Sequence, residues 1–277
     1  MKRIILLFLF ILKGFLFNAQ SVADYTIYYN FKCVSDTIEN EFFTPEEFIL
    51  YRVGHESRFV SSGRYYNDST TVVFEKTHPQ PMFNSQEEVQ KYIDLIAEKR
   101  DRKNIQSDYR ITKNFETSNF TSLLIFSLPI QYQEETMNFL WEITNETDTI
   151  LGLPCIKAFT NYGGRHYFAW FTLAVPINDG PYVFQGLPGL ILKVIDDRGW
   201  YNFVVTNIIT EKTNRYWNPE FMNKFSQKID RKTFVSKMTE LKRNPQMPAE
   251  VLNFSEEARL KRKKAYEKRF DFLIEQN

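Results

Sequence analysis

Apolar and polar residues alternate along most of the chain, and this alternation predicts a protein built mainly from β-strands. Tyr25, Ile27, Tyr29 and Phe31 occupy every second position of the first such segment. A period of two places their side chains on one buried face of a strand. The predicted strands are residues 25–32, 48–53, 57–61, 70–76, 109–115, 120–128, 130–133, 139–144, 150–162, 165–175, 190–195 and 201–209.

Short turn signals separate these strands and predict antiparallel neighbours. Gly163-Gly164 fits a two-residue hairpin, because such turns need positive φ angles that glycine adopts without strain. Connections of this length are too short for crossover helices, so consecutive strands are expected to form a meander. The other predicted turns lie near Asn67-Asp68 and at residues 145–148, 179–181 and 196–199.

Helical spacing replaces the alternation in two parts of the chain. Ser85 and Glu88 can form a capping box before an apolar stripe, which predicts a helix near residues 86–103. After about residue 210 the period of two is lost altogether. The predicted C-terminal helices start at Asn218-Pro219, at Asp230 and at Ser255, and the last of them ends near Ile274.

These elements predict an α+β fold. Its core is a curved, mainly antiparallel sheet, a half-barrel-like meander, with one helix inserted near 86–103 and the C-terminal helices packed on it. No Gly/Ser-rich or Pro-rich linker interrupts residues 21–277, so we expect a single domain that is β-rich to about residue 210 and helical over 218–277. The 26 Phe and 15 Tyr of the sequence can supply a large core.

Residues 1–20 have the pattern of a secretory signal peptide. Lys2 and Arg3 precede an apolar core at residues 4–12, and Ala19 offers a cleavage site near Gln20. The alternative is a membrane anchor, but Lys13 interrupts the apolar run, which is shorter than the roughly 20 residues that a span needs. We therefore expect an exported protein, periplasmic or secreted, with no transmembrane span.

Charge is distributed unevenly although the whole chain has a net charge of only +1. Acidic residues are in excess over residues 21–210 and basic residues over 211–277. A basic tail can contact anionic lipid headgroups, as in an outer-membrane-associated protein, or the acidic part of its own chain, and the second interpretation is the simpler. No nucleic-acid partner is expected in this compartment.

Catalytic and metal-binding motifs are absent from the sequence. The three histidines, His55, His78 and His166, lack the close spacing of zinc ligands, so no metal and no cofactor are expected. There is no GxSxG motif for a serine nucleophile. Cys33 and Cys155 allow either one disulfide or two buried thiols.

The segment Gly186-Leu-Pro-Gly-Leu-Ile191 resembles the hallmark of the GLPGLI family of secreted bacterial proteins. Neighbouring residues agree with that resemblance: Trp141, Gly152, Cys155, Ala158, Gly164-Arg165, Ala169-Trp170, Pro176 and Gly180-Pro181. The resemblance implies a cell-envelope protein of Gram-negative bacteria with a sheet-based fold, and it brings no catalytic residue. Cys155 fits the family pattern and Cys33 does not, which favours two free thiols. The strand order also resembles half-barrel lipoprotein carriers of the periplasm, an analogy of fold alone.

Two interpretations of the Gly186–Ile191 segment remain open. The favoured one is a shaped turn before the buried strand at 190–195, because the glycine spacing matches no phosphate-binding motif. The other is a loop whose exposed amides hold a ligand.

The leading functional hypothesis is a non-enzymatic binding protein that holds an apolar small molecule or an envelope client protein in the concavity of the sheet. One alternative is a secreted hydrolase in which His166, Arg165 and a carboxylate converge. Another is an envelope interaction module that acts through the basic helix at 256–277. The candidate ligand-binding residues are Trp141, Arg165, Phe168, Trp170, Gly186, Leu187, Pro188 and Gly189.

Overall fold

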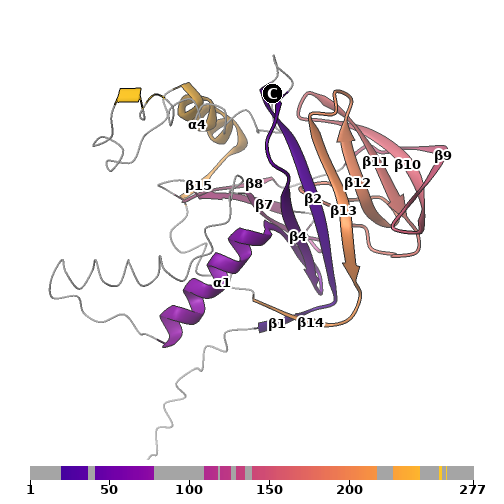
Figure 1. Cartoon of the computed structure of the whole chain (residues 1–277), viewed down its shortest axis with the longest axis horizontal. Coiled ribbons are helices and arrows are strands. Elements are labelled where there is room, and N and C mark those ends of the chain that lie inside the picture. Colours follow the sequence, from indigo (N-terminus) through magenta and orange to yellow (C-terminus); the bar gives the residue numbers. More distant parts are fainter. Residues whose placement is uncertain are drawn as a thin grey trace, which may run out of the picture.

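A long, curved β-sheet forms the body of the computed structural model (Figure 1). The structure describes residues 20–36, 41–77, 109–117, 119–125, 129–134, 139–216, 227–243, 256–257 and 260. The strands run in the order β15-β8-β7-β6-β5-β4-β2-β13-β12-β11-β10-β9, with β3 beside β2. All pairs are antiparallel except β15 with β8. The predicted α+β fold with a curved, mainly antiparallel sheet is therefore confirmed.

Most of the strands overlap predicted segments, but β1, β3, β14 and β15 were not predicted, and β15 lies within residues 218–277, which were expected to be helical. A separate two-stranded sheet is formed by β1 and β14. The strands are β1 Gln20–Ala23, β2 Tyr25–Asp36, β3 Glu41–Phe42, β4 Glu46–Val53, β5 Glu56–Ser61, β6 Tyr109–Asn114, β7 Asn119–Ile125, β8 Pro129–Glu134, β9 Glu142–Ile150, β10 Leu153–Tyr162, β11 Arg165–Thr172, β12 Leu190–Asp196, β13 Tyr201–Ile209, β14 Thr213–Tyr216 and β15 Gln227–Ile229.

The predicted Gly163-Gly164 hairpin is confirmed. Both glycines have positive φ angles, 55° and 75°, and Tyr162 pairs with Arg165 across the turn. Register shifts interrupt the ladders of β9–β10, β11–β12 and β2–β13. Such bulges bend strands and increase their twist, which accounts for the curvature of the sheet.

The prediction of a strand at 70–76, with a turn near Asn67-Asp68, was wrong. These residues belong to helix α1, Ser62–Thr77. The β-branched run within this segment favours a strand locally. The start of the helix makes tertiary contacts instead: the Tyr65 ring lies 5.8 Å from that of Tyr51, and Arg110 donates two 2.8 Å hydrogen bonds to Asp68.

The turn predicted at residues 145–148 was also wrong, because these residues lie within β9. The turn follows at Leu151-Gly152, where both φ angles are positive. Asn145 and Asp148 are typical of loops, yet here they are exposed on a strand that pairs on one side only among the described strands. An exposed edge strand tolerates the polar residues that otherwise mark turns.

The helix α4, Arg231–Arg243, confirms the predicted cap at Asp230. Asp230 accepts hydrogen bonds from the Thr233 amide at 2.7 Å and from the Thr233 hydroxyl at 3.1 Å, and the amide bond lowers the pKa of its carboxyl group. Phe234 of α4 joins the main core. The helices predicted at 86–103 and from Asn218 lie outside the described residues, and of the last one only 256–257 and 260 are described, as helix.

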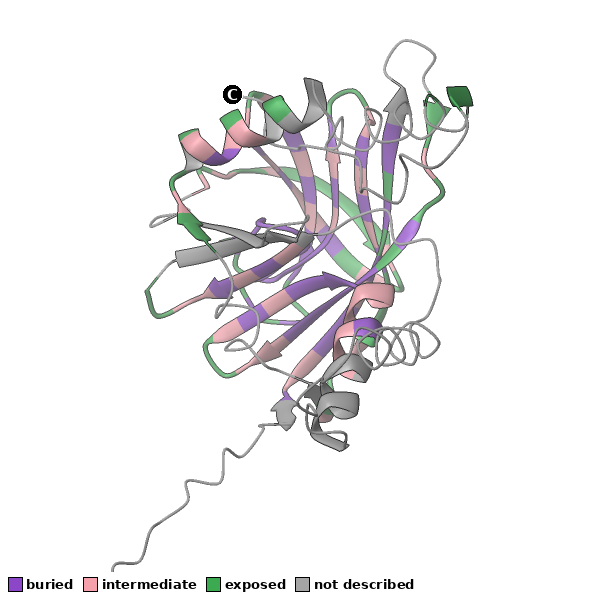
Figure 2. Ribbon diagram, turned by 90° about the vertical axis from the view of Figure 1, so that its left-hand side faces the viewer, coloured by how far each residue is buried: buried purple, intermediate pink, exposed green. Residues whose placement is uncertain are grey.

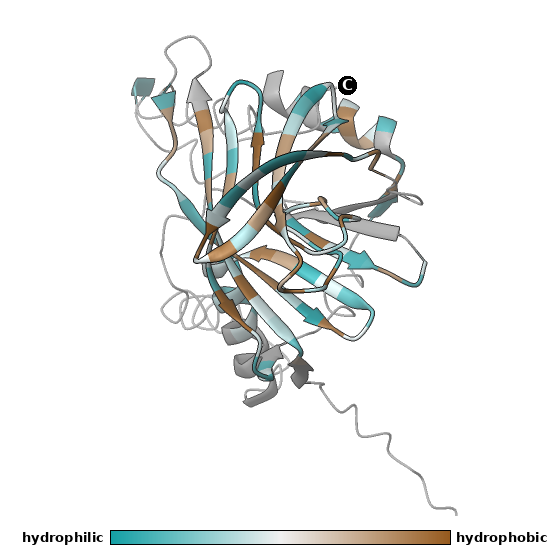
Figure 3. Ribbon diagram, turned by 90° about the vertical axis from the view of Figure 1, so that its right-hand side faces the viewer, coloured by the Kyte–Doolittle hydropathy of each residue, from teal (hydrophilic) through white to brown (hydrophobic). Residues whose placement is uncertain are grey.

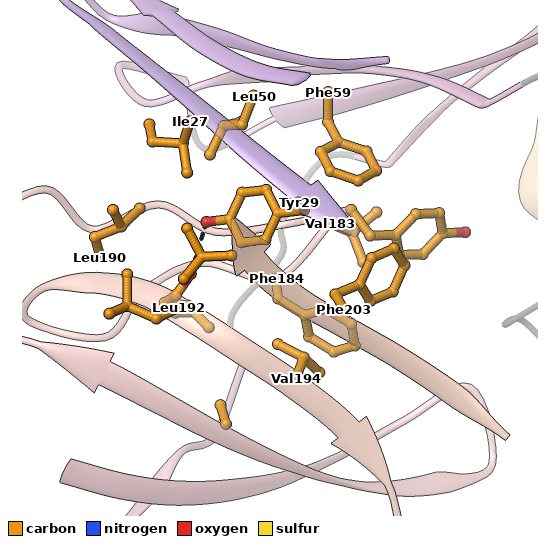
Figure 4. Packing of buried hydrophobic residues seen from close by; sticks show 14 of the residues in the cluster. Ile27, Tyr29, Leu50, Phe59, Val183, Phe184, Leu190, Leu192, Val194 and Phe203 are labelled. Atoms are coloured by element: carbon orange, nitrogen blue, oxygen red, sulfur yellow. Dashed lines mark hydrogen bonds between the residues drawn. The ribbon is translucent and has the colours of Figure 1, made fainter. Parts of the chain in front are cut away.

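The core lies almost entirely on the concave side of the sheet, and Figure 2 shows the buried residues alternating along the strands. Residues 173–189, which connect β11 to β12 and which we call the inner loop, fill this side. Figure 4 shows Val183 and Phe184 among residues from β2, β4 and β5 on one side and β12 on the other. A smaller cluster of Ala23, Ile49, Tyr51 and Val60 lies on the opposite face, where Tyr65 of α1 packs.

A buried ion pair ties the inner loop to the sheet. Lys113 Nζ of β6 lies 2.5 Å from Asp179 Oδ1, and both side chains are fully buried. The ammonium group also donates to the carbonyl oxygens of Gly180 at 2.6 Å and Phe184 at 3.4 Å. Burial lowers the pKa of Lys113, and the charge of Asp179 opposes that shift.

Replacing Lys113 by Met is expected to lower the free energy of unfolding by about 3–5 kcal/mol, because Asp179 would keep a buried charge without its cation. Chemical denaturation followed by circular dichroism measures the loss. The double variant K113M/D179N should recover part of it, and K212M, at an exposed lysine, should change little. A loss below about 1 kcal/mol for K113M would contradict this role.

Candidate functional site

The two faces of β11 separate the candidate residues predicted from the sequence. Tyr167, Ala169 and Phe171 are buried on the concave side, where the ring of Tyr167 lies 4.9 Å from that of Phe184. Phe168 and Trp170 alternate with these residues, point to the opposite face and are partly exposed. The predicted set therefore does not form one pocket.

Trp141 and Gly186 meet on the concave side. The indole Nε1 of Trp141 donates a 2.8 Å hydrogen bond to the carbonyl oxygen of Gln185. Gly186 has a φ angle of 93°, and a Cβ atom at this position would lie 3.8 Å from the same Nε1. Leu187 is buried in the core. Trp141 thus fastens the end of the inner loop.

Gly189 lies very close to the backbone of Thr172. A Cβ atom built on it would lie 2.0 Å from the carbonyl oxygen of Thr172 and 2.7 Å from its carbonyl carbon. Pro188, beside it, is exposed. The turn and the buried strand expected here are both present, since Gly186 has a positive φ angle and β12 begins at Leu190.

Arg165 pairs with Asp196 and does not approach His166. Its Nη1 donates a 3.3 Å hydrogen bond to Asp196 Oδ2, and its guanidinium group lies 4.6 Å from the centre of the Tyr201 ring. His166 Nδ1 lies 2.9 Å from Asn161 Oδ1 instead. The convergence of Arg165, His166 and a carboxylate, which would have favoured a hydrolase, is therefore not observed.

Burial shifts the pKa of Asp196. Desolvation raises it above the usual value, and the amide of Tyr201, which donates a 2.9 Å hydrogen bond, and the nearby Arg165 act against that rise. Asp196 is 2% exposed, so its charge depends on these partners.

The aromatic residues on the outer side of the sheet define the best candidate for binding. We call Lys157, Phe159, Phe168, Trp170, Lys193 and Ile195, from β10, β11 and β12, the outer aromatic surface. Two cross-strand rows form it: Phe159, Phe168 and Ile195 in one, and Lys157, Trp170 and Lys193 in the other. All six are partly exposed. Figure 3 shows hydrophobic and hydrophilic residues alternating along the strands of the sheet.

Two lysines flank the indole ring of Trp170. Lys193 Nζ lies 4.4 Å from the ring centre and Lys157 Nζ lies 5.8 Å from it. Lys157 is also paired with Glu146 at 2.8 Å. Lys193 forms no ion pair with any residue in the described part of the chain. This surface combines aromatic rings, which bind apolar groups, with a cation that has no carboxylate partner there.

Four of these six residues were not among the candidates from the sequence. The signal for two of them was present: the Gly163-Gly164 hairpin fixes the register that places Lys157 opposite Trp170 and Phe159 opposite Phe168. The pairing of Lys193 with Trp170 and of Ile195 with Phe168 could not be predicted in this way. The register shifts between Trp170 and Phe171, so counting along the two strands from the loop that connects them does not give the correct partners.

Nucleophiles and metal ligands are poorly placed in the described part of the chain. Cys33 and Cys155 are buried free thiols, and desolvation raises the pKa of both, so the thiolate forms are disfavoured. No group of three or more His, Cys, Asp or Glu side chains is close enough to hold a metal ion among the described residues. The helices that the structure describes are also too short or too polar to cross a membrane.

The fold and the surface define an open antiparallel sheet with a filled concave side and an aromatic outer side. Residues 164–193 match a family described as "Protein of unknown function (Porph_ging)". The match contains the Gly186–Ile191 segment and is compatible with the resemblance noted above, over a short part of the chain. No curated protein matches the sequence.

The chain is also similar in structure to PNGF-II, in the P21 and C2 space groups. The TM-scores are 0.49 and 0.48, each at 14% sequence identity. The aligned region covers 76% and 78% of this chain and 32% of the PNGF-II chain in both cases. This chain therefore spans about a third of the length of that protein.

The variant G189A is expected to lower the free energy of unfolding by about 1–3 kcal/mol, because the added methyl group collides with backbone atoms of Thr172. Urea denaturation measures the change, and P188A, at the exposed neighbour, is the matched control. Equal stabilities of G189A and P188A would show that close backbone contact is not what requires glycine at this position.

The variant R165Q should be destabilised by about 1.5–3 kcal/mol at pH 7, and less at acidic pH. The pKa of Asp196 is already raised in the folded protein, and loss of the cation raises it further. A raised folded-state pKa gives stability that is complete below the unfolded-state pKa and is lost as the pH rises through the folded-state value. Thermal unfolding of R165Q and R165K across pH 3.5–7 tests this, and a pH-independent difference between R165Q and the wild type would contradict it.

Proposed function

We propose that the protein is an exported, non-enzymatic binding protein that holds an amphipathic ligand, an apolar chain with an acidic head group, on the outer aromatic surface. The single observation that carries the proposal is the partly exposed Trp170 ring between Lys157 and Lys193. The signal-peptide pattern of residues 1–20 supports export.

The concavity of the sheet is a poorer site for such a ligand. Tyr182, Val183 and Phe184 of the inner loop occupy it, and all three are buried. An apolar molecule on that side would have to displace these side chains from the core. The outer aromatic surface needs no displacement, because its rings are already partly exposed on paired strands.

The chemistry of the surface selects the ligand. Apolar ligand surface that is buried against aromatic rings stabilises the complex by about 25 cal/mol per Å². Lys193 can form an ion pair with an acidic head group without breaking an existing ion pair, whereas Lys157 is already paired with Glu146. A purely apolar ligand would gain nothing from either lysine.

Dodecanoate, below its micelle concentration, is expected to bind the protein saturably in calorimetric titration. The variant W170A should weaken binding about tenfold, which corresponds to the ~1.4 kcal/mol of a partly buried aromatic ring. K193M should weaken it several-fold at low salt and less at high salt, because salt screens an exposed charge.

Dodecyl maltoside has the same apolar chain and a neutral head group, so it separates the contribution of the chain from that of the head-group charge. It should bind the wild type and K193M equally. L173A, at an exposed leucine outside the surface, is the control variant. Absence of saturable dodecanoate binding, or equal binding by W170A with an unchanged circular dichroism spectrum, would contradict the proposal.

A further inference from the structure

The strand β9 ends the sheet and leaves one of its edges unpaired among the described strands. It pairs with β10 on its other side. Residues 145–149 are all exposed, and the strand contains no proline that would remove a backbone donor. An unpaired edge presents a row of backbone N–H and C=O groups that can pair with another chain.

Exposed hydrophobic side chains gather at this edge. Leu140, just before β9, is 85% exposed, Ile143 within it is 54% exposed, and Leu151, just after it, is 52% exposed. Single exposed hydrophobic residues are ordinary on protein surfaces, but these three all lie within residues 140–151 and so form a local group. They offer apolar contacts to a segment lying along the strand.

The charge of β9 indicates what kind of segment fits. Glu142, Glu146 and Asp148 are exposed, and the strand carries no Lys or Arg. Among the residues that the structure describes, Lys157, 2.8 Å from Glu146, is the one cation paired with these carboxylates. Pairing of β9 with a second copy of itself would place acidic side chains against acidic side chains, which is destabilising. A basic strand would meet opposite charges.

A bulge limits the region that can pair. The β9–β10 register shifts between Ile156 and Ala158, and Thr144 Oγ1 occupies the bulge by donating a 3.0 Å hydrogen bond to the carbonyl oxygen of Lys157. Regular pairing with β10 resumes from Thr147 to Ile150. An added strand can therefore pair with Glu142 and Ile143 before the bulge and with Thr147–Ile150 after it.

We propose that β9 binds a basic, extended segment of a partner protein by strand addition. The backbone of the segment pairs with the free edge, its basic residues face Glu142 and Asp148, and its apolar residues contact Ile143 and Leu151. This mode uses main-chain hydrogen bonds for affinity and alternate side chains for specificity.

An eight-residue peptide of alternating Lys and Val, labelled with a fluorophore, provides the probe. Fluorescence anisotropy should show saturable binding, and hydrogen exchange should show new protection within residues 142–150. A peptide with two central valines replaced by proline should bind at least tenfold more weakly, because it lacks the donors and cannot extend the ladder. A peptide of alternating Glu and Val should not bind.

The double variant E142K/D148K should lose at least tenfold in affinity for the Lys-Val peptide and gain affinity for the Glu-Val peptide. The control D197K/E211K has the same change in net charge at exposed positions outside β9. W170A should bind the peptide like the wild type, so failure of the dodecanoate proposal and failure of this one can be told apart.

Three outcomes would overturn the inference. Equal loss in E142K/D148K and D197K/E211K would show attraction to net charge alone. Equal binding of the proline peptide would show that no strand is added. Concentration-dependent dimerisation of the wild type in sedimentation, abolished by the Lys-Val peptide or by E142K/D148K, would assign the edge to a second copy.

Discussion

The inner loop joins the two arms of the curved sheet, and the rest of the structure depends on that contact. The sheet has one largely apolar face, and the buried side chains of residues 173–189 pack against it. The ring of Tyr182 stacks on Phe203 at 6.3 Å, and Phe184 contacts Tyr167 at 4.9 Å. Tyr182 accepts a left-handed φ angle of 52° to reach this position, a strain that the surrounding packing must offset.

The Gly186–Ile191 segment follows from the same constraint. The chain must leave the core, pass the backbone of Thr172 and enter β12 within a few residues. Gly186 supplies the left-handed turn and Gly189 the space for close approach. Backbone groups of the loop find partners inside the core, since the carbonyl oxygen of Asp179 accepts a hydrogen bond from the Ile191 amide and those of Gly180 and Phe184 accept from Lys113. The most distinctive motif of the sequence is thus a structural one.

Local pattern was sufficient for most of the long strands and for the β10–β11 register, because alternation and a two-residue turn are properties of neighbouring residues. It missed the short strands β1, β3, β14 and β15. It failed where distant contacts decide. Tyr65 and Asp68 hold a β-branched segment in the helix α1, and the polar residues of β9 look like a turn until the strand is seen at an edge. Of the candidate site, Phe168 and Trp170 were found from the sequence. Their separation from Trp141 could not be predicted, because it depends on which face of the sheet the inner loop covers.

The pairing of β2 with β13 constrains the order in which the sheet can fold. β2 lies near the start of the chain, and its partner for that edge is residues 201–209. Closing so long a loop is slow, because its entropy is lost before the contacts form. Until residues 201–209 are in place, Tyr29 and Phe31 lie on an open edge of a partial sheet. Such edges attract other unfinished chains, so the edge of β2 stays unprotected until about three-quarters of the chain is available to fold.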